Sequence, residues 1–165
     1  MMTRGDAAGI GGFTYRTVFS VSNNHSSQRG FFGIRGSPTA WSGTDFPPNG
    51  VSLCIGVGFD AATHTNYQIA HSAHSNNSGS YIDTGIPLGD ASAVLELILK
   101  CPPNGNEIAW SLKDYNSGAS ASGTIASNIP NKDVYYSHRL RMDNNGAAAA
   151  VSADFYGVWY SNYLG

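Results

Sequence analysis

From residue 13 to residue 164 the chain alternates apolar and polar residues in short stretches, and glycine, asparagine, serine and proline separate these stretches. Alternation with a period of two places successive side chains on opposite faces, which is the pattern of a half-buried β-strand. Residues 89–99 have the composition of a helix, but their run Val-Leu-Glu-Leu-Ile-Leu favours a strand. The sequence therefore predicts an all-β domain.

The alternating stretches predict about ten strands, which hairpins and longer crossovers connect without a fixed repeat. This organisation favours a two-sheet antiparallel sandwich of jelly-roll or lectin-like type, with a closed barrel as the alternative. The strands are expected at residues 13–22, 31–35, 51–60, 67–73, 80–84, 94–101, 107–115, 121–126, 134–143 and 148–164.

Two local features define how the later strands are arranged. Asn104-Gly105 predicts a tight hairpin, in which Leu97 and its alternate neighbours face Trp110 and Leu112 in the core. Gly157 shifts the alternation of the last strand, as a β-bulge or a bend between sheets would. Both Trp110 and Trp159 are expected to pack in the core.

Residues 1–12 are expected to form a flexible N-terminal lead, and residues 13–165 a single domain large enough to bury its own core. The lead lacks the apolar run of a signal peptide, and no stretch is long and apolar enough to span a membrane. Cys54 and Cys101 fall on opposite faces by parity, which predicts two free thiols and a reducing compartment.

Charged residues make up only 12% of the chain, and the formal net charge is −2. A nucleic-acid partner is not expected, because such a partner requires a clustered basic face. So few charged residues are compatible with a surface that is largely covered by other subunits. Glycine, serine, asparagine and aromatic residues are abundant, which favours a recognition or assembly role over catalysis.

The sequence predicts neither an active site nor a metal site. Glycoside cleavage uses two carboxylates across a cleft, whereas Glu96 and Glu107 lie at opposite ends of one hairpin. His64, His71 and His74 do not match a zinc-binding spacing. Asp60 and Asn66 lack the dense acidic loop of a calcium site. We therefore predict a non-catalytic protein without cofactors.

Aromatic side chains are the best candidates for ligand contacts. Sugars stack their C–H faces on tryptophan and tyrosine, while polar side chains bind the hydroxyl groups. Residues 36–50 form an unusually long Pro-bearing loop that is the first candidate for a binding site. The candidate glycan-binding residues are Trp41, Tyr115, Tyr135 and Tyr163. The alternative for each is a rim or subunit-interface residue.

From about residue 31 onward the chain resembles the β-sandwich domains near the ends of bacteriophage tail fibres and tailspikes. The resemblance lies in the order of the segments and in their residue composition. The sequence departs from that family at residues 70–72 and at Tyr135-Tyr136. The segments that carry it are residues 31–33, 54–60, 66–72, 82–85, 95–97, 103–105 and 118–130, the last including Ser122-Gly123-Thr124 and Asn128-Ile129-Pro130.

The resemblance implies a homotrimeric virion appendage that is assembled in the bacterial cytoplasm without cofactors. Its implied partners are further copies of itself, other tail proteins and a host cell-surface saccharide. Two alternatives remain open at this point. One is a purely structural virion protein, such as a trimer cap or capsid decoration, and the other is a monomeric carbohydrate-binding module of a larger enzyme.

Overall fold

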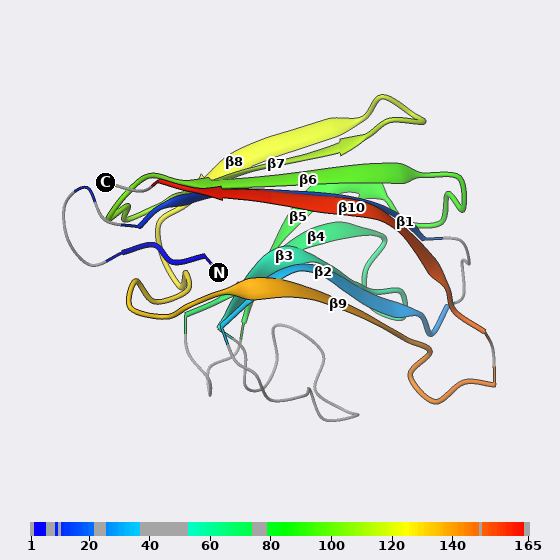
Figure 1. Ribbon diagram of the computed structural model, residues 1–165. Coiled ribbons are helices and arrows are strands. Elements are labelled where there is room, and N and C mark those ends of the chain that lie inside the picture. The colour runs from blue at the N-terminus through cyan, green and yellow to red at the C-terminus, as the bar shows by residue number, and fades with distance from the viewer. Residues whose placement is uncertain are drawn as a thin grey trace.

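The computed structural model describes residues 2–5, 9, 11–21, 26–36, 53–73, 79–148 and 150–163. These residues form ten strands in two five-stranded sheets, and every ladder pairs antiparallel neighbours. The two sheets stack face to face (Figure 1). The predicted all-β sandwich is confirmed. No helix among the described residues is long and apolar enough to cross a membrane.

The first sheet has the order β10-β1-β6-β7-β8, and the second has the order β5-β4-β3-β2-β9. The strands of the first sheet are β1 (Phe13–Val21), β6 (Val94–Cys101), β7 (Ile108–Asp114), β8 (Ser120–Ile125) and β10 (Ala153–Asn162). Those of the second are β2 (Arg29–Arg35), β3 (Cys54–Asp60), β4 (Asn66–Ser72), β5 (Ser80–Pro87) and β9 (Ser137–Asp143).

The inward-facing side chains of both sheets form the main core. Phe19 of β1 stacks on Phe32 of β2 with ring centroids 3.8 Å apart, which joins the two layers directly. Each large apolar side chain that is fully buried contributes about 1.5–3 kcal/mol before the loss of chain entropy is subtracted. The β6–β7 register pairs Leu97 with Leu112 and Leu99 with Trp110, as the sequence predicted.

A β-bulge interrupts the pairing of β1 with β10, which confirms the irregularity predicted at Gly157. Val18 pairs with Gly157 and Phe19 with Phe155, so Tyr156 has no partner in the register. Beyond the bulge Trp159 lies opposite Arg16 and is 49% exposed. The expectation that Trp159 packs in the core is therefore wrong, because the extra residue turns it outward. Trp110 is buried, as expected.

Residues 2–5 are anchored, where a flexible lead was expected. Met2 is 2% exposed and exchanges two backbone hydrogen bonds with Tyr136, of 3.0 and 2.6 Å. Arg4 is also buried, and its guanidinium donates to the carbonyl oxygens of Pro130 and Gly105. Buried apolar surface and paired backbone groups thus hold this segment against the loop that precedes β9.

The outward face of β3 carries small residues that allow a close approach. The ring of Phe31 from β2 takes this space, because a Cβ added at Gly56 would lie 2.9 Å from Phe31 Cζ. Phe31, Cys54 and Ala70 form a second, smaller buried cluster there, whereas Cys101 belongs to the main core. Both cysteines are buried and free, which confirms the predicted absence of a disulfide.

We predict that Gly56→Ala destabilises the protein by about 1–3 kcal/mol, as overpacking of a filled space does. The added Cβ would lie 2.5 Å from the Phe32 carbonyl oxygen and 2.7 Å from Gly33 Cα. These are backbone atoms, which can move away only by distorting the β2–β3 pairing. Urea denaturation measures the effect, with Ser122→Ala on the exposed edge strand β8 as the control. An unfolding free energy equal to that of the control would contradict the packing described for Phe31.

Candidate functional site

Two adjoining hollows mark the outer face of the first sheet. One has a volume of about 220 Å³ and is lined by Thr14, Arg16, Trp159, Tyr160 and Ser161. The other has a volume of about 210 Å³ and is lined by Ile98, Lys100, Ala109, Trp110 and Ser111. Thr14 pairs with Lys100 and Arg16 with Ile98, so the hollows are neighbours across the β1–β6 ladder. We call the residues that line both hollows the β1/β6 groove.

Small side chains create the groove, and larger ones border it. Thr14, Ala109 and Ser111 point outward from β1 and β7 and fill little space, while Trp159 and Lys100 stand beside them. Strands of this length hold outward side chains in fixed positions, because burial of the opposite face fixes their register. The groove is therefore a surface of preset shape with an indole, two cations and several hydroxyl groups.

Trp159 and Arg16 form the aromatic border of the groove. The Arg16 Cζ lies 4.5 Å from the centroid of the indole, a cation–π contact worth about 0.5–1 kcal/mol at an exposed site. The indole also covers Gly157, since a Cβ there would lie 2.9 Å from Trp159 Cη2. Any larger residue at the bulge would displace the ring. The bulge thus turns Trp159 outward, and its glycine leaves the space that the indole ring occupies.

Glu96 connects this border to the far end of the sheet. Its Oε1 accepts a hydrogen bond from Arg16 Nε, and its Oε2 accepts one of 2.9 Å from the Tyr115 hydroxyl. The Glu96 carboxylate raises the pKa of Arg16 above its ordinary value, chiefly through that hydrogen bond. Lys113 Nζ lies 4.7 Å from the centroid of the Tyr115 ring. Both Glu96 oxygens are thus occupied, and Arg16 is held in one orientation.

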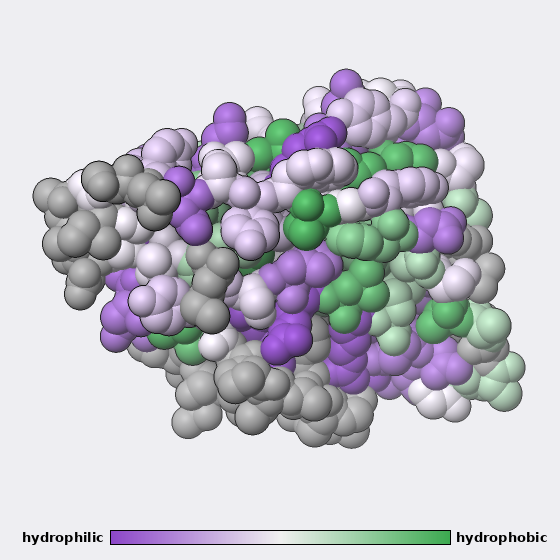
Figure 2. Space-filling model, viewed as in Figure 1, coloured by the Kyte–Doolittle hydropathy of each residue, from purple (hydrophilic) through white to green (hydrophobic). Residues whose placement is uncertain are grey.

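Exposed apolar side chains gather at the open edge of the sandwich, where the edge strands β9 and β10 face each other. Leu140 of β9 and Phe155, Tyr156, Trp159 and Tyr160 of β10 are five of the eight large exposed hydrophobic residues. Apolar surface is visible along these two strands in Figure 2. A soluble monomer rarely exposes so concentrated a patch unless it is an interaction surface.

His138 lies just inside this open edge. Its Nδ1 is 2.7 Å from the Tyr15 hydroxyl, and its ring centroid is 5.0 Å from that of Phe155. Burial lowers the pKa of His138 below its ordinary value, and the neighbouring Arg139 lowers it further. The neutral imidazole is therefore the form that the folded protein prefers.

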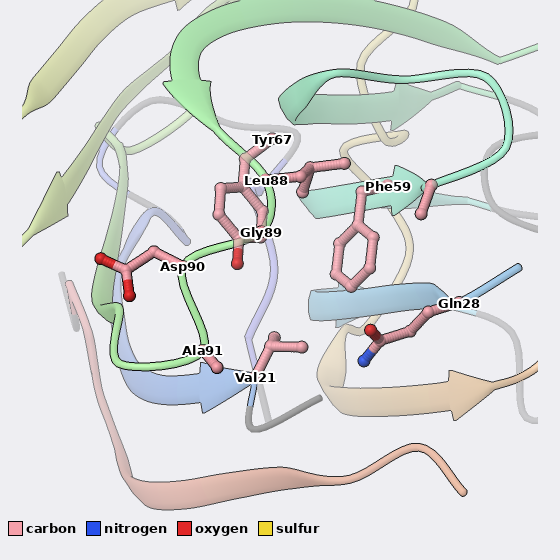
Figure 3. Close-up of a pocket in the computed structure, with 9 residues that line it drawn as sticks. Val21, Gln28, Phe59, Tyr67, Leu88, Gly89, Asp90 and Ala91 are labelled. Carbon is pink, nitrogen blue, oxygen red and sulfur yellow. The ribbon is translucent and has the colours of Figure 1, made fainter. Parts of the chain in front are cut away.

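A further cavity lies at the end of the sandwich near the β5–β6 connection (Figure 3). The side chains of Tyr67 and Phe59 point into it from one side and those of Gln28 and Val21 from the other. Its volume of about 10 Å³ is at the lower limit of the space that one water molecule needs. It therefore has room for a water molecule and none for a sugar ring.

The structure separates the aromatic residues that the sequence singled out. Tyr115 lies after β7 and binds Glu96, and Tyr163 lies after β10, where its N–H donates to the Gly12 carbonyl. These positions are at opposite ends of the eight-residue strand β6, about 25 Å apart at roughly 3.3 Å per residue. Tyr135 is 64% exposed in the loop before β9 and lies outside the groove. Trp41 and all but Gly36 of the loop at residues 36–50 lie outside the described residues.

Trp159 is the groove residue that sequence reasoning missed. The signal was present, because β10 carries large apolar residues on both parities on either side of Gly157. A strand with apolar residues on both faces is either covered on both faces or exposes one of them as an interaction surface. Only the pairing of β10 at the edge of the first sheet decides between these two.

The histidines that the sequence placed near one another have separate roles. The Asp60 N–H donates to His64 Nδ1 at 3.0 Å, and His71 Nδ1 lies 3.0 Å from the Asn128 carbonyl oxygen. Burial lowers the pKa of both imidazoles. His74 lies outside the described residues. Within the described part of the chain, no three His, Cys, Asp or Glu side chains come together as a metal site would require.

Comparison with known proteins identifies the fold. No protein-family model and no curated protein sequence matches the chain. Lectin II from Ulex europaeus superposes on 99% of this chain and 78% of its own, with a TM-score of 0.63 and 15% identity. The chain has a lectin-like sandwich fold. At such identities the similarity defines the fold alone.

Two other solved structures share the fold. The CBM2 module of the evolved Dit protein of Lactobacillus casei BL23 phage J-1 matches 93% of this chain and 62% of its own, with a TM-score of 0.57 and 9% identity. The family 7 alginate lyase A1-II′, solved with a substrate, matches 98% of this chain and 65% of its own, with a TM-score of 0.55 and 16% identity. The fold therefore accommodates both binding proteins and enzymes.

We predict that the unfolding free energy falls as the pH drops below about 6.5, the ordinary pKa of histidine. Because the pKa of His138 is lowered on folding, its contribution is complete above that pH and is lost as the imidazole becomes protonated. Urea denaturation at about pH 7.5 and 5.5 should give a smaller difference for His138→Gln than for the unmodified protein. Equal differences for the two proteins would contradict this.

Proposed function

We propose that this protein recognises a cell-surface saccharide through the β1/β6 groove. The observation that carries the proposal is Trp159, an indole that is half exposed at the border of a hollow and fixed by Arg16 and Gly157. Aromatic faces stack on the apolar faces of sugar rings, and such an anchor with a few well-placed polar groups is the usual composition of a small-molecule site.

The remaining groove residues supply polar contacts around that anchor. Thr14, Ser111 and Ser161 present hydroxyl groups, which both donate and accept hydrogen bonds, as the hydroxyl groups of a sugar require. Lys100 adds a charged donor. Because these side chains project from paired strands, little conformational entropy is lost when a ligand binds.

A binding role fits the groove better than a catalytic one. Hydrolysis of a glycoside needs an acid and a second carboxylate about 5–10 Å apart on either side of the bond. The residues that line the groove include no carboxylate, and the nearby Glu96 is engaged by Arg16 and Tyr115.

We further propose that the protein is a domain of a bacteriophage tail appendage, a tail fibre or tailspike, that acts in the virion during host attachment. The resemblance of residues 31 onward to such domains supports this, and the fold similarity to a module of a phage J-1 Dit protein is compatible with it. The proposed partners are a host saccharide and other tail proteins, with assembly in the bacterial cytoplasm.

The open edge offers an interface for the homotrimer that the resemblance implies. Leu140 and Phe155 are 42% and 43% exposed although both project from the inward faces of their strands, where a neighbouring subunit would cover them. If this edge served only assembly and the groove bound nothing, the protein would instead be a structural virion component. A monomer would favour the carbohydrate-binding module.

The first test replaces the groove indole. We expect Trp159→Ala to weaken binding to host-surface oligosaccharides at least about tenfold, because it removes the aromatic surface on which the sugar is proposed to stack. Calorimetry with fragments of host polysaccharide measures the effect, and circular dichroism confirms the fold. Tyr135→Ala is the matched control, since it removes an exposed aromatic residue outside the groove. Equal affinities for both variants and the unmodified protein would contradict the proposed site.

The second test measures assembly. Light scattering is expected to give a mass about three times 17.4 kDa for the unmodified protein. Leu140→Glu should give a monomer, because a charge at a covered apolar contact loses its hydration. Ser122→Glu on the distant edge strand β8 should remain trimeric. A monomeric unmodified protein would contradict the trimer. The saccharide site would still be tested independently by Trp159→Ala.

A further inference from the structure

The charges around the β1/β6 groove are unevenly distributed. The residues that line its two hollows include two cations, Arg16 and Lys100, and no acid. A third cation, Lys113, lies on the same outer face, two register positions from the Ile98–Ser111 pair. The whole chain has nine Lys and Arg residues and a net charge of −2. The positive charge at the groove is therefore a local concentration and does not reflect the charge of the whole chain.

None of the described acidic residues forms an ion pair with Lys100. Glu96 forms its ion pair with Arg16, and Asp154 lies opposite Ser20 at the far side of the bulge. Glu107 precedes β7 and is exposed, but it forms no ion pair with a described cation. Among the described residues Lys100 makes no ion pair, and its side chain is exposed within the second hollow.

The register places this ammonium group on the same face as the aromatic anchor, two strands away. Lys100 pairs with Thr14, which pairs in turn with Ser161, and Trp159 lies two residues before Ser161 on β10. At about 4.8 Å between strands and about 3.3 Å per residue, the Cα atoms of Lys100 and Trp159 are roughly 12 Å apart. A sugar ring stacked on the indole would therefore bring a substituent of the next ring within reach of Lys100.

We infer that the groove selects a saccharide that carries an anionic substituent, and that Lys100 is the residue that makes the selection. This inference rests on the proposed saccharide site. The ammonium group can form an ion pair with an anionic substituent, whereas a neutral sugar can only accept a hydrogen bond from it. Arg16 supports the selection through its positive charge but is held in place by Glu96.

The test compares a uronic acid oligosaccharide with its carboxyl-reduced, neutral counterpart by calorimetry. We expect the unmodified protein to bind the acidic form more tightly, and the difference to shrink as salt is added. Lys100→Gln should lower the affinity for the acidic form about 1.5- to fivefold, the range for an exposed charge pair, and leave the affinity for the neutral form unchanged. Lys100→Arg should retain the preference.

Control variants separate the possible outcomes. Lys132→Gln removes the same charge from the chain outside the groove and should have no effect, because Lys132 is bound to Asn104 at the β6–β7 turn. If Lys100→Gln leaves the acidic preference intact while Trp159→Ala abolishes binding, the inference is wrong and the saccharide site stands. If neither oligosaccharide binds, the saccharide site itself is overturned. A sulfated oligosaccharide that also binds more tightly than the neutral form would support the inference, because the selection is for negative charge.

Discussion

The pairing of β1 between β6 and β10 is the constraint on which the rest of the molecule depends. Its inward residues, among them Phe19 stacked on Phe32, fasten the first sheet to the second. Because a slip of one residue would expose this apolar face, burial fixes the register. The same register then determines which side chains stand outside, and it brings Thr14 and Arg16 next to Lys100 and Ile98. The proposed binding surface is therefore a consequence of the core.

One extra residue in β10 gives this surface its aromatic anchor. Without the bulge between Val18 and Phe19, the parity of Phe155 would continue and Trp159 would face the core. The indole instead lies over Gly157 and against Arg16, which Glu96 holds in place. Charged residues are scarce in this chain, so a fixed ion pair beside an exposed tryptophan stands out from the largely neutral surface. The bulge thus links a local irregularity of the backbone to the recognition that we propose.

Most of the fold could be predicted from the sequence, because period-two alternation and Asn-Gly turns are local signals. The bounds of β6 agree with the prediction, and Leu97 and Leu99 face the predicted core residues of β7. Edge positions could not be predicted, because they depend on which strands are neighbours in space. The face of Trp159 depends on where the extra residue of β10 falls, so Trp159 was assigned to the core, and the anchoring of Met2 against Tyr136 was not foreseen. Tyr115 was proposed as an aromatic residue at a loop or outward position, whereas its bond to Glu96 requires the folded sheet.

The most direct test of the saccharide site is a nuclear magnetic resonance titration of the isotope-labelled protein with oligosaccharides from the host surface. We expect the indole N–H signal of Trp159 to shift as ligand is added. The backbone amide signals of Ile98, Lys100 and Ser111 should shift over the same range of ligand concentration, because these residues line the same groove. If only signals of the second sheet shift and the Trp159 indole signal is unchanged at saturation, the proposed saccharide site in the β1/β6 groove is wrong.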